Sequence, residues 1–161
     1  GCRVIGTVGS DEKISIAKKN GCDFVINYSK DDFSKKVLEL TKGNGVSVVF
    51  DGVGRNTFHK SIECLKTRGM MVSFGNASGS LENIDVKKSI QPKGLYFTRP
   101  AMMHYLNSKD ELKEAAKKLF ECVILGKIKI EIFKKYRLDE VVQAHKDLES
   151  RKIIGSGIII P

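Results

Sequence analysis

Short runs of apolar residues, several of them β-branched, alternate along this chain with segments whose apolar residues recur at helical spacing. The runs lie at Val4–Val8, Phe24–Asn27, Val46–Phe50, Met70–Phe74 and Gly94–Thr98. Crossovers of this length between strands are right-handed, so the alternation predicts an α/β fold with a parallel sheet and helices on both faces. Ligands of such sheets bind beyond the carboxyl ends of the strands, and the residues there are the first candidates for a site.

The expected helices follow from the same spacing and from turn residues between the runs. They are Asp11–Asn20, Asp31–Thr41, a helix carrying Phe58, Ile62 and Leu65, a short helix near Val86–Ile90, a helix from Ser108 to Gly126 and a last one over Asp139–Glu149. The Val46–Phe50 strand is predicted to be buried on both faces, and Val142 and Leu148 are predicted to be buried. Ser108 and Glu111 fit a capping box. Extended pieces are expected at 128–130, 136–138 and 158–160.

Composition excludes several classes of protein. The 161 residues are 41% apolar and 29% charged, which is ordinary for a globular domain. The net charge of +9 comes from lysines interleaved with acids and without recurring aromatic residues, so nucleic-acid binding is not favoured. No apolar run reaches the ~20 residues of a membrane span, and no secretory signal is seen, so we expect a cytoplasmic protein. The four cysteines form no C-x-x-C pair, and we predict no metal site.

The corner between the first strand and the first helix is the strongest candidate for a cofactor site. Where a doubly wound fold binds NAD, an acid near this strand end usually takes the ribose hydroxyls, whereas a 2′-phosphate needs that acid absent and a cation nearby. Here the strand ends at Thr7–Ser10, Ser10 is a candidate N-cap, and Lys13 follows one turn later. The corner predicts a phosphorylated ribose, hence NADPH over NADH. The alternative, a solvated lysine at position 13, stays open.

The glycine-rich phosphate loop of dinucleotide folds has no clear counterpart. The nearest match to G-x-G-x-x-G is Gly52–Thr57, where threonine replaces the third glycine and no acid follows at the expected distance. We interpret it as a strand-end turn that approaches the cofactor edge-on. Tyr28 either stacks on adenine or caps its strand. Asn76 either binds a carboxamide or ribose or is a turn residue, and Arg99 either holds a phosphate or lies at a subunit contact.

The Gly94–Thr98 strand is the last of the parallel series. If it forms a sheet edge, the same strand of a second copy can pair with it, so we expect a homodimer. No catalytic residue is assigned from the sequence.

Together these segments resemble the quinone oxidoreductase branch of the medium-chain dehydrogenase/reductases, the zeta-crystallin-like NADPH:quinone reductases. The matching stretches are Thr7–Lys13, Val25–Tyr28, Val49–Gly54, Gly69–Gly79, Tyr96–Pro100 and Leu148–Arg151, followed by Gly155–Pro161. The resemblance covers essentially the whole chain.

The resemblance implies hydride transfer from NADPH to a quinone without zinc, at a site between a Rossmann domain and a catalytic domain. By position, Ser10 and Lys13 would face the 2′-phosphate and Tyr28 the adenosine. The nicotinamide half would be lined by Val53, Phe74, Gly75 and Asn76, with Pro100 to Met102 near the ring.

The chain enters the family pattern at the second strand of the Rossmann domain. The resemblance therefore implies a C-terminal fragment that lacks the first strand, the phosphate loop and the N-terminal catalytic domain. Residues 1–113 would be a partial NADP(H)-binding domain, and residues 114–161 would rejoin the catalytic domain. We expect the fragment alone to show little turnover. The alternative reading is a non-catalytic nucleotide-binding or RNA-binding module.

Overall fold

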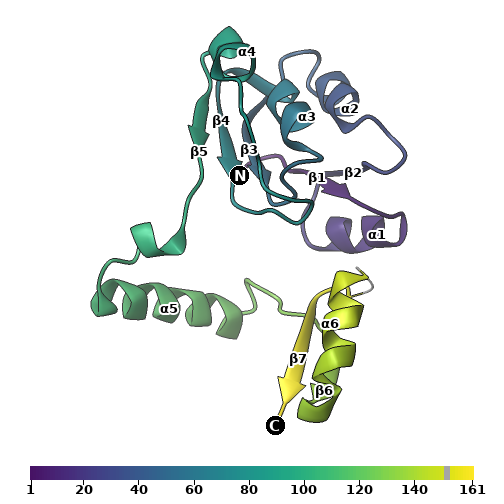
Figure 1. Cartoon of the computed structure of the whole chain (residues 1–161), viewed down its shortest axis with the longest axis vertical. Coiled ribbons are helices and arrows are strands. Elements are labelled where there is room, and N and C mark those ends of the chain that lie inside the picture. The colour runs from purple at the N-terminus through teal and green to yellow at the C-terminus, as the bar shows by residue number, and fades with distance from the viewer. Residues whose placement is uncertain (151–152) are drawn as a thin grey trace. The chain divides into compact units, whose positions relative to one another are not determined.

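A computed structural model describes residues 1–150 and 153–161, which form two compact units, Gly1–His104 and Tyr105–Pro161 (Figure 1). Arg151, which belongs to one of the resembling stretches, lies outside the described residues. The predicted division between residues 113 and 114 falls within one helix, and the assignment of the second part to a catalytic domain stays a prediction.

The first unit alternates strands and helices as predicted. In chain order it contains β1 (Ile5–Val8), α1 (Glu12–Lys19), β2 (Phe24–Asn27), α2 (Phe33–Leu40), β3 (Val46–Asp51), α3 (Phe58–Glu63), β4 (Leu65–Ser73), α4 (Val86–Ser89), η1 (Gln91–Lys93), β5 (Tyr96–Thr98) and η2 (Met102–His104). Every strand pair in this unit is parallel, which confirms the α/β class.

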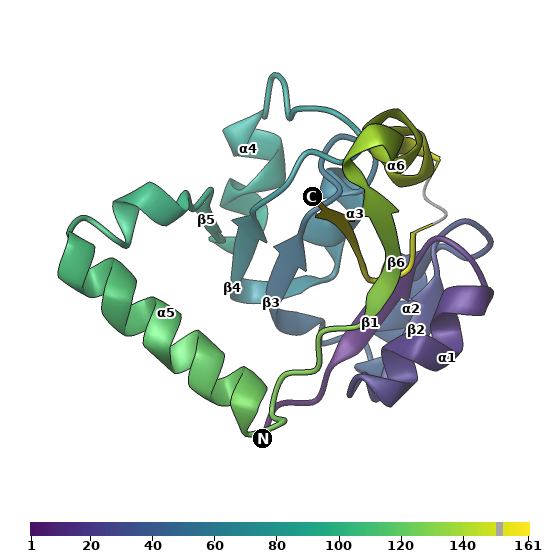
Figure 2. The same cartoon turned by 90° about the horizontal axis from the view of Figure 1, so that it is seen from below.

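The strands of this unit form two separate hydrogen-bonded ladders. β1 pairs with β2, and β3, β4 and β5 pair in that order, so that β3 and β4 lie side by side (Figure 2). In register, Ile5 faces Phe24 and Val49 faces Met71. Among the described residues no hydrogen-bonded ladder joins β1 to β3. β5 is an edge strand, which is the condition on which the expected homodimer depends.

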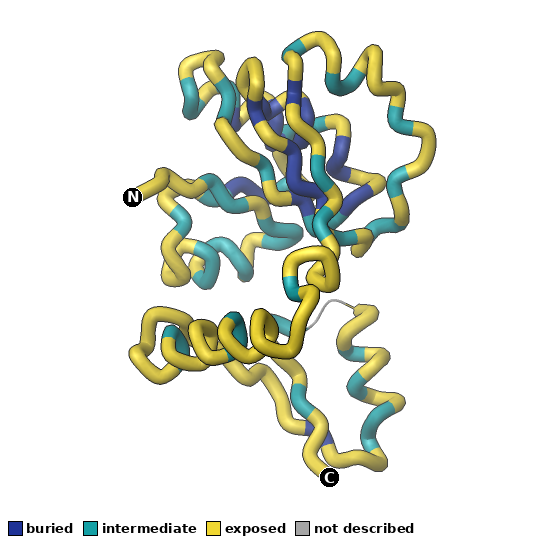
Figure 3. Tube along the Cα trace, turned by 90° about the vertical axis from the view of Figure 1, so that its left-hand side faces the viewer, coloured by how far each residue is buried: buried dark blue, intermediate teal, exposed yellow. Residues whose placement is uncertain are grey.

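The core of the first unit consists of two apolar clusters that share β3. One contains Phe58, Ile62, Leu65, Met71 and Leu95, and the other contains Ile26, Phe33, Val37 and Cys64. Val46 and Val49 pack against both clusters. Buried positions accordingly gather in this unit, whereas the second unit is mostly exposed (Figure 3).

The prediction that β3 is buried on both faces is wrong. Val49 packs into the core, but its neighbours Val48 and Phe50 are exposed. Successive side chains of a strand point to opposite faces, so α3, which contacts β3 and β4, covers only one of them.

The connection from α3 to β4 also differs from the prediction. Leu65, expected in the helix, is the first residue of β4, and the strand begins five residues before the expected Met70. Within β4, Arg68 adopts a positive φ of 58°, and the pairing register with β3 shifts between Val46 and Val48. Leu65 is nevertheless buried in the core. The helical spacing of apolar residues therefore predicted its burial correctly but its secondary structure incorrectly.

The second unit contains α5 (Lys109–Ile124), β6 (Ile132–Arg137), η3 (Leu138–Glu140), α6 (Val141–Glu149) and β7 (Ser156–Ile160), with β6 and β7 parallel. The capping box is confirmed: the Ser108 hydroxyl accepts from the Glu111 N–H at 3.2 Å, and the Glu111 carboxylate accepts from the Ser108 N–H at 3.0 Å. One strand, β6, replaces the two predicted extended pieces.

Burial in the second unit is lower than predicted. Val142 and Leu148 are exposed, so their predicted burial is wrong. A two-stranded ladder with one helix against it offers little apolar surface, and Tyr136 is buried there instead. No helix among the described residues has both the length and the apolar composition needed to cross a bilayer.

Candidate functional site

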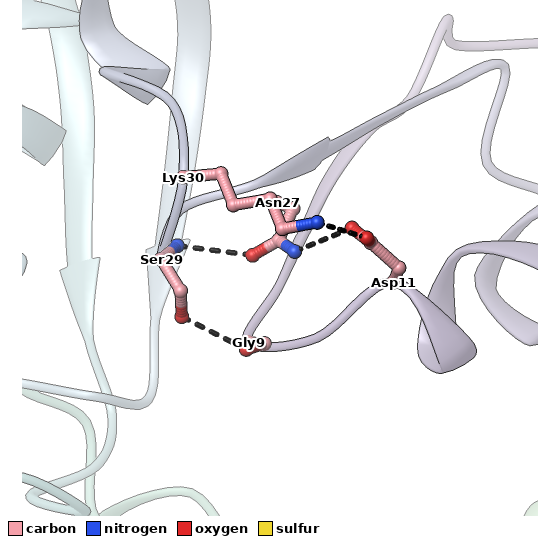
Figure 4. A network of polar contacts seen from close by, with 5 residues as sticks. All are labelled: Gly9, Asp11, Asn27, Ser29 and Lys30. Atoms are coloured by element: carbon pink, nitrogen blue, oxygen red, sulfur yellow. Dashed lines mark hydrogen bonds and ion pairs between the residues drawn. The ribbon is translucent and has the colours of Figure 1, made fainter.

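The first group of candidate residues lies where β1 and β2 end. The Tyr28 N–H donates to the Val8 carbonyl at 3.0 Å, and the Ser29 hydroxyl donates to the Gly9 carbonyl at 2.8 Å (Figure 4). A Cβ at position 9 would lie 2.9 Å from the Tyr28 hydroxyl oxygen. A side chain at position 9 would therefore displace the end of the Tyr28 ring from this turn.

Asp11 takes the N-cap position that was predicted for Ser10, so the predicted cap is wrong. Asp11 has helical backbone angles and forms no side-chain cap. Its carboxylate instead accepts from Asn27 Nδ2 at 2.7 Å and from the Lys30 ammonium (Figure 4). The hydrogen bond from Lys30, followed by that from Asn27, lowers the pKa of Asp11, and the bond to Asp11 raises the pKa of Lys30.

Asn27 connects the two strand ends in this network. It is buried, donates to Asp11 and accepts from the Ser29 N–H at 3.0 Å through Oδ1 (Figure 4). Lys13 follows Asp11 by two residues, in the first turn of α1, and its backbone N–H donates to the Ser10 carbonyl at 3.2 Å. One acid of the predicted ribose corner, Asp11, is thus paired with a lysine and an amide.

The second group is built on Asp51 at the end of β3. Its buried carboxylate accepts from the backbone N–H groups of Val53 at 2.8 Å and Gly54 at 3.0 Å, both through Oδ1. The hydroxyls of Thr57 and Ser61 each donate to Oδ2 at 2.8 Å. The N–H groups of Val53 and Gly54 are therefore used by Asp51. Gly52–Thr57 forms a strand-end turn, and its edge-on approach to a cofactor stays a prediction.

The turn after β4 packs directly against the turn after β3. The Phe74 N–H donates to the Asp51 carbonyl at 2.9 Å, and its exposed ring lies against Gly52. A Cβ on Gly75 would overlap the carbonyl oxygen of Gly52. The Ser78 hydroxyl and backbone N–H both donate to the Val53 carbonyl at 2.8 Å. The structure thus brings Val53, Phe74 and Gly75 together.

Asn76 is connected to the end of β5 through Arg99. The guanidinium donates to Asn76 Oδ1 at 3.0 Å and to the Ser73 hydroxyl at 3.2 Å. Arg99 thus joins two strand ends, a contact that neither sequence interpretation included. Pro100 follows directly, and Met102 is exposed in η2.

The predicted site residues therefore form two groups, one on each ladder. A groove of about 750 Å³ lies between β1 and β3, and of the predicted residues Val53 lines it. Sequence reasoning missed Asp11, Asn27, Lys30 and Asp51. Asn27 and Asp51 could have been found from the sequence, because each is a polar residue at the end of an apolar run. A polar side chain at such a position is buried with the strand end and must form hydrogen bonds there.

Metal-binding side chains do not cluster in the described part of the chain: no three His, Cys, Asp or Glu residues there are placed to hold an ion.

Comparison with known proteins identifies relatives of this chain. The family model of zinc-binding dehydrogenases matches residues 1–121. The chain is 42% identical to a 2-haloacrylate reductase from a Burkholderia species and 42% identical to quinone oxidoreductase 1 of Escherichia coli, over all of this chain in both cases. It spans 49% and 50% of their lengths, so the chain covers about half of the curated relatives it matches.

Solved structures give the same result. The crystal structure of Escherichia coli quinone oxidoreductase complexed with NADPH matches with a TM-score of 0.94 and 42% identity, over 99% of this chain and 49% of that one. The structure of 2-haloacrylate reductase matches with a TM-score of 0.89 and 41% identity, over 100% of this chain and 50% of that one. The chain belongs to the zinc-binding dehydrogenase family, in the quinone oxidoreductase branch of the medium-chain dehydrogenases/reductases.

Proposed function

We propose that the first unit supplies part of an NADPH site in an oxidoreductase that reduces quinones. The observation that carries the proposal is the pairing of Asp11 with Lys30 and Asn27 at the end of β1. The paired cation offsets the charge of this acid, so the acid repels a 2′-phosphate less than an unpaired one would, and Lys13 adds a positive charge at the same corner. The Escherichia coli relative, whose structure contains NADPH, supports this interpretation.

The proposed contacts follow the two groups of residues. Ser10 and Lys13 would bind the 2′-phosphate, and Tyr28, held over Gly9, would face the adenosine. Val53, Phe74, Gly75 and Asn76 would line the nicotinamide half, with Pro100 and Met102 near the ring. Gly52 and Gly75 themselves present no side chain where their backbones approach, which suits a flat ligand.

Arg99 has a positioning role in this proposal. Because Asn76 Oδ1 is bound by the guanidinium, the amide would offer its Nδ2 donor to a ligand carbonyl. The cofactor supplies a hydride when bound. The chain's own residues bind and orient it, and no residue here is assigned to proton transfer.

Binding of the two dinucleotides to the 161-residue chain tests the cofactor. We expect NADPH to bind more tightly than NADH in isothermal titration calorimetry. The Lys13→Met variant should weaken NADPH about tenfold and leave NADH unchanged, since one charge-assisted hydrogen bond is lost (about 1.4 kcal/mol). Lys113→Met, an exposed lysine of α5 paired with Asp110, is the matched control. Equal loss for both dinucleotides, or salt-dependent RNA binding without a dinucleotide preference, would contradict the proposal.

The electron acceptor is proposed from the relatives. Quinones and 2-haloacrylates both carry a carbon–carbon double bond conjugated to a carbonyl group, and we propose a quinone-like acceptor of this type. The chain by itself should turn over little NADPH with benzoquinone, because it spans about half of its relatives. Turnover equal to that of Escherichia coli quinone oxidoreductase 1 in the same absorbance assay would contradict this expectation.

A homodimer through the Gly94–Thr98 segment remains part of the proposal. β5 is a sheet edge with an exposed Tyr96, which is compatible with strand pairing between two copies. Analytical ultracentrifugation should show a dimer that Tyr96→Pro disrupts, since proline removes an N–H and cannot continue an edge ladder. A dimer unchanged by this variant would place the interface elsewhere.

A further inference from the structure

The corner where β1 and β2 end holds a cation that the proposed phosphate contacts do not use. Lys30 follows the end of β2, and its backbone N–H donates to the Asn27 carbonyl at 3.1 Å, which closes a tight turn. The Lys30 ammonium donates to the Asp11 carboxylate, which lies in the turn between β1 and α1 (Figure 4). Lys30 therefore belongs to the same corner as Ser10 and Lys13, although it comes from the other strand of the ladder.

Asp11 accepts two of the donors that the corner offers. Its Oδ1 accepts from Asn27 Nδ2 at 2.7 Å, and its Oδ2 accepts from the Lys30 ammonium. The Asn27 amide is fixed in place, because it is buried and its Oδ1 accepts from the Ser29 N–H at 3.0 Å. Lysine ammonium groups form charge-assisted hydrogen bonds with carboxylates and phosphates alike. Asp11 is thus an anion that the protein itself supplies to donors that also suit a phosphate.

The bond between Lys30 and Asp11 can be exchanged for a bond with a ligand. Both side chains are exposed, by 67% for Lys30 and by 55% for Asp11. An ion pair between exposed side chains contributes little net free energy, because water solvates both charges when they separate. A phosphate monoester carries about two negative charges at pH 7, so it attracts an ammonium group more strongly than a carboxylate does. Lysine also has a flexible stem, which allows Lys30 to change partners.

We propose that Lys30 transfers from Asp11 to the 2′-phosphate of NADPH on binding, so that Asp11 is an internal competitor of the cofactor. The inference rests on the proposed function, since it requires NADPH to occupy this corner. Lys30 then determines cofactor specificity, because NADH has no 2′-phosphate to which the ammonium could transfer.

A different role for Lys30 would be to screen Asp11 alone. In that case the ammonium stays on the carboxylate, reduces its repulsion of the phosphate and forms no bond with the cofactor. The two roles differ once Asp11 has lost its charge. Lys30 should then still strengthen phosphate binding if it contacts the phosphate, and should have no effect if it only screens Asp11.

Isothermal titration calorimetry of the 161-residue chain with adenosine 2′,5′-bisphosphate and adenosine 5′-monophosphate separates these roles. The two probes differ by the 2′-phosphate alone, and neither contains the nicotinamide half of the cofactor. We expect the bisphosphate to bind more tightly. Asp11→Asn should strengthen bisphosphate binding about fivefold, because the competitor is lost, and should change monophosphate binding by less than about twofold.

Lys30→Met in the Asp11→Asn background is the decisive variant. It should weaken bisphosphate binding about tenfold relative to Asp11→Asn alone, since a charge-assisted hydrogen bond to the phosphate is lost. Lys30→Arg in the same background keeps the charge and should bind the bisphosphate within about twofold of Asp11→Asn. Asp31→Asn is the matched control, because it removes an equal charge from the residue that follows Lys30, and it should change bisphosphate binding by less than about twofold. Unchanged far-ultraviolet circular dichroism verifies that each variant is folded, and Asp11→Ala is the substitute if Asp11→Asn is not.

Three results would overturn the proposal. If the bisphosphate is preferred but Lys30→Met has no effect in the Asp11→Asn background, Lys30 only screens Asp11, and the proposed function stands. If Asp31→Asn strengthens binding as much as Asp11→Asn, net charge and not an internal competitor sets the affinity. If the unaltered chain binds both probes equally, the proposed function fails together with this inference.

Discussion

Replacing Asp51 with alanine should destabilise the first unit more than any surface change. Oδ1 of Asp51 accepts two backbone N–H groups, from Val53 at 2.8 Å and Gly54 at 3.0 Å, and the Gly54 bond is buried. In the Asp51→Ala variant these donors lose their acceptor, at a cost of about 1–3 kcal/mol each. Relief from burying a carboxylate offsets part of this, so we expect a net loss of about 3 kcal/mol.

Asp51→Asn is the matched variant, because the amide keeps an oxygen where Oδ1 accepts both backbone bonds. Only the Oδ2 side changes, where the Thr57 and Ser61 hydroxyls can rotate to accept from the new amide. The expected loss is about 1 kcal/mol. Asp110→Ala, at an α5 side chain that is 94% exposed, should change stability by less than ~0.5 kcal/mol.

Urea-dependent hydrogen exchange of residues 46–73 measures this stability for the first unit alone. With a denaturant slope of about 2 kcal/mol/M, Asp51→Ala should lower the midpoint by about 1.5 M. The reasoning is refuted if alanine and asparagine cost the same, because the loss would then arise from the missing charge and not from unsatisfied N–H groups.

The other predictions concern single contacts. In the Lys30→Met variant, the pKa of Asp11 should rise toward its ordinary value of 3.8 in a carbon-detected NMR titration. Because the pKa of Asp11 is lowered in the folded state, the pair contributes its full stabilisation to the fold above pH 3.8, and this contribution is lost as the pH falls through the lowered pKa. An Asp11 pKa that does not change in the Lys30→Met variant would exclude the pairing. Gly75→Ala should cost at least ~1 kcal/mol, measured by the same exchange method, since its Cβ would overlap the Gly52 carbonyl. Ser108→Ala should remove about 1 kcal/mol of α5 stability, seen as loss of helical circular dichroism on heating, and retention of the full signal would contradict the capping role.

Elements with their own local signals could be predicted from the sequence. The capping box at Ser108 and the alternation from β1 to β5 depend on nearest neighbours along the chain, and both were predicted correctly. The family, suggested by the stretches around Thr7–Lys13 and Gly69–Gly79, is confirmed by the comparisons.

Features set by contacts between distant residues could not be predicted. Phe50 and Val142 are apolar by pattern but exposed in the structure, because the surface available to cover them depends on tertiary packing. The pairing of Asp11 with Lys30 joins residues 19 positions apart, which no local spacing reveals. The sequence located the ends of the strands but not the hydrogen bonds made there.

The backbone contact between Gly52 and Gly75 has a consequence for how this chain can diverge. Since Gly75 meets main-chain atoms of Gly52, a methyl group gained at position 75 would have to be accommodated by a change in length or conformation of the turn that contains Gly52. In related sequences, positions 52 and 75 should therefore either both be conserved as glycine or change together.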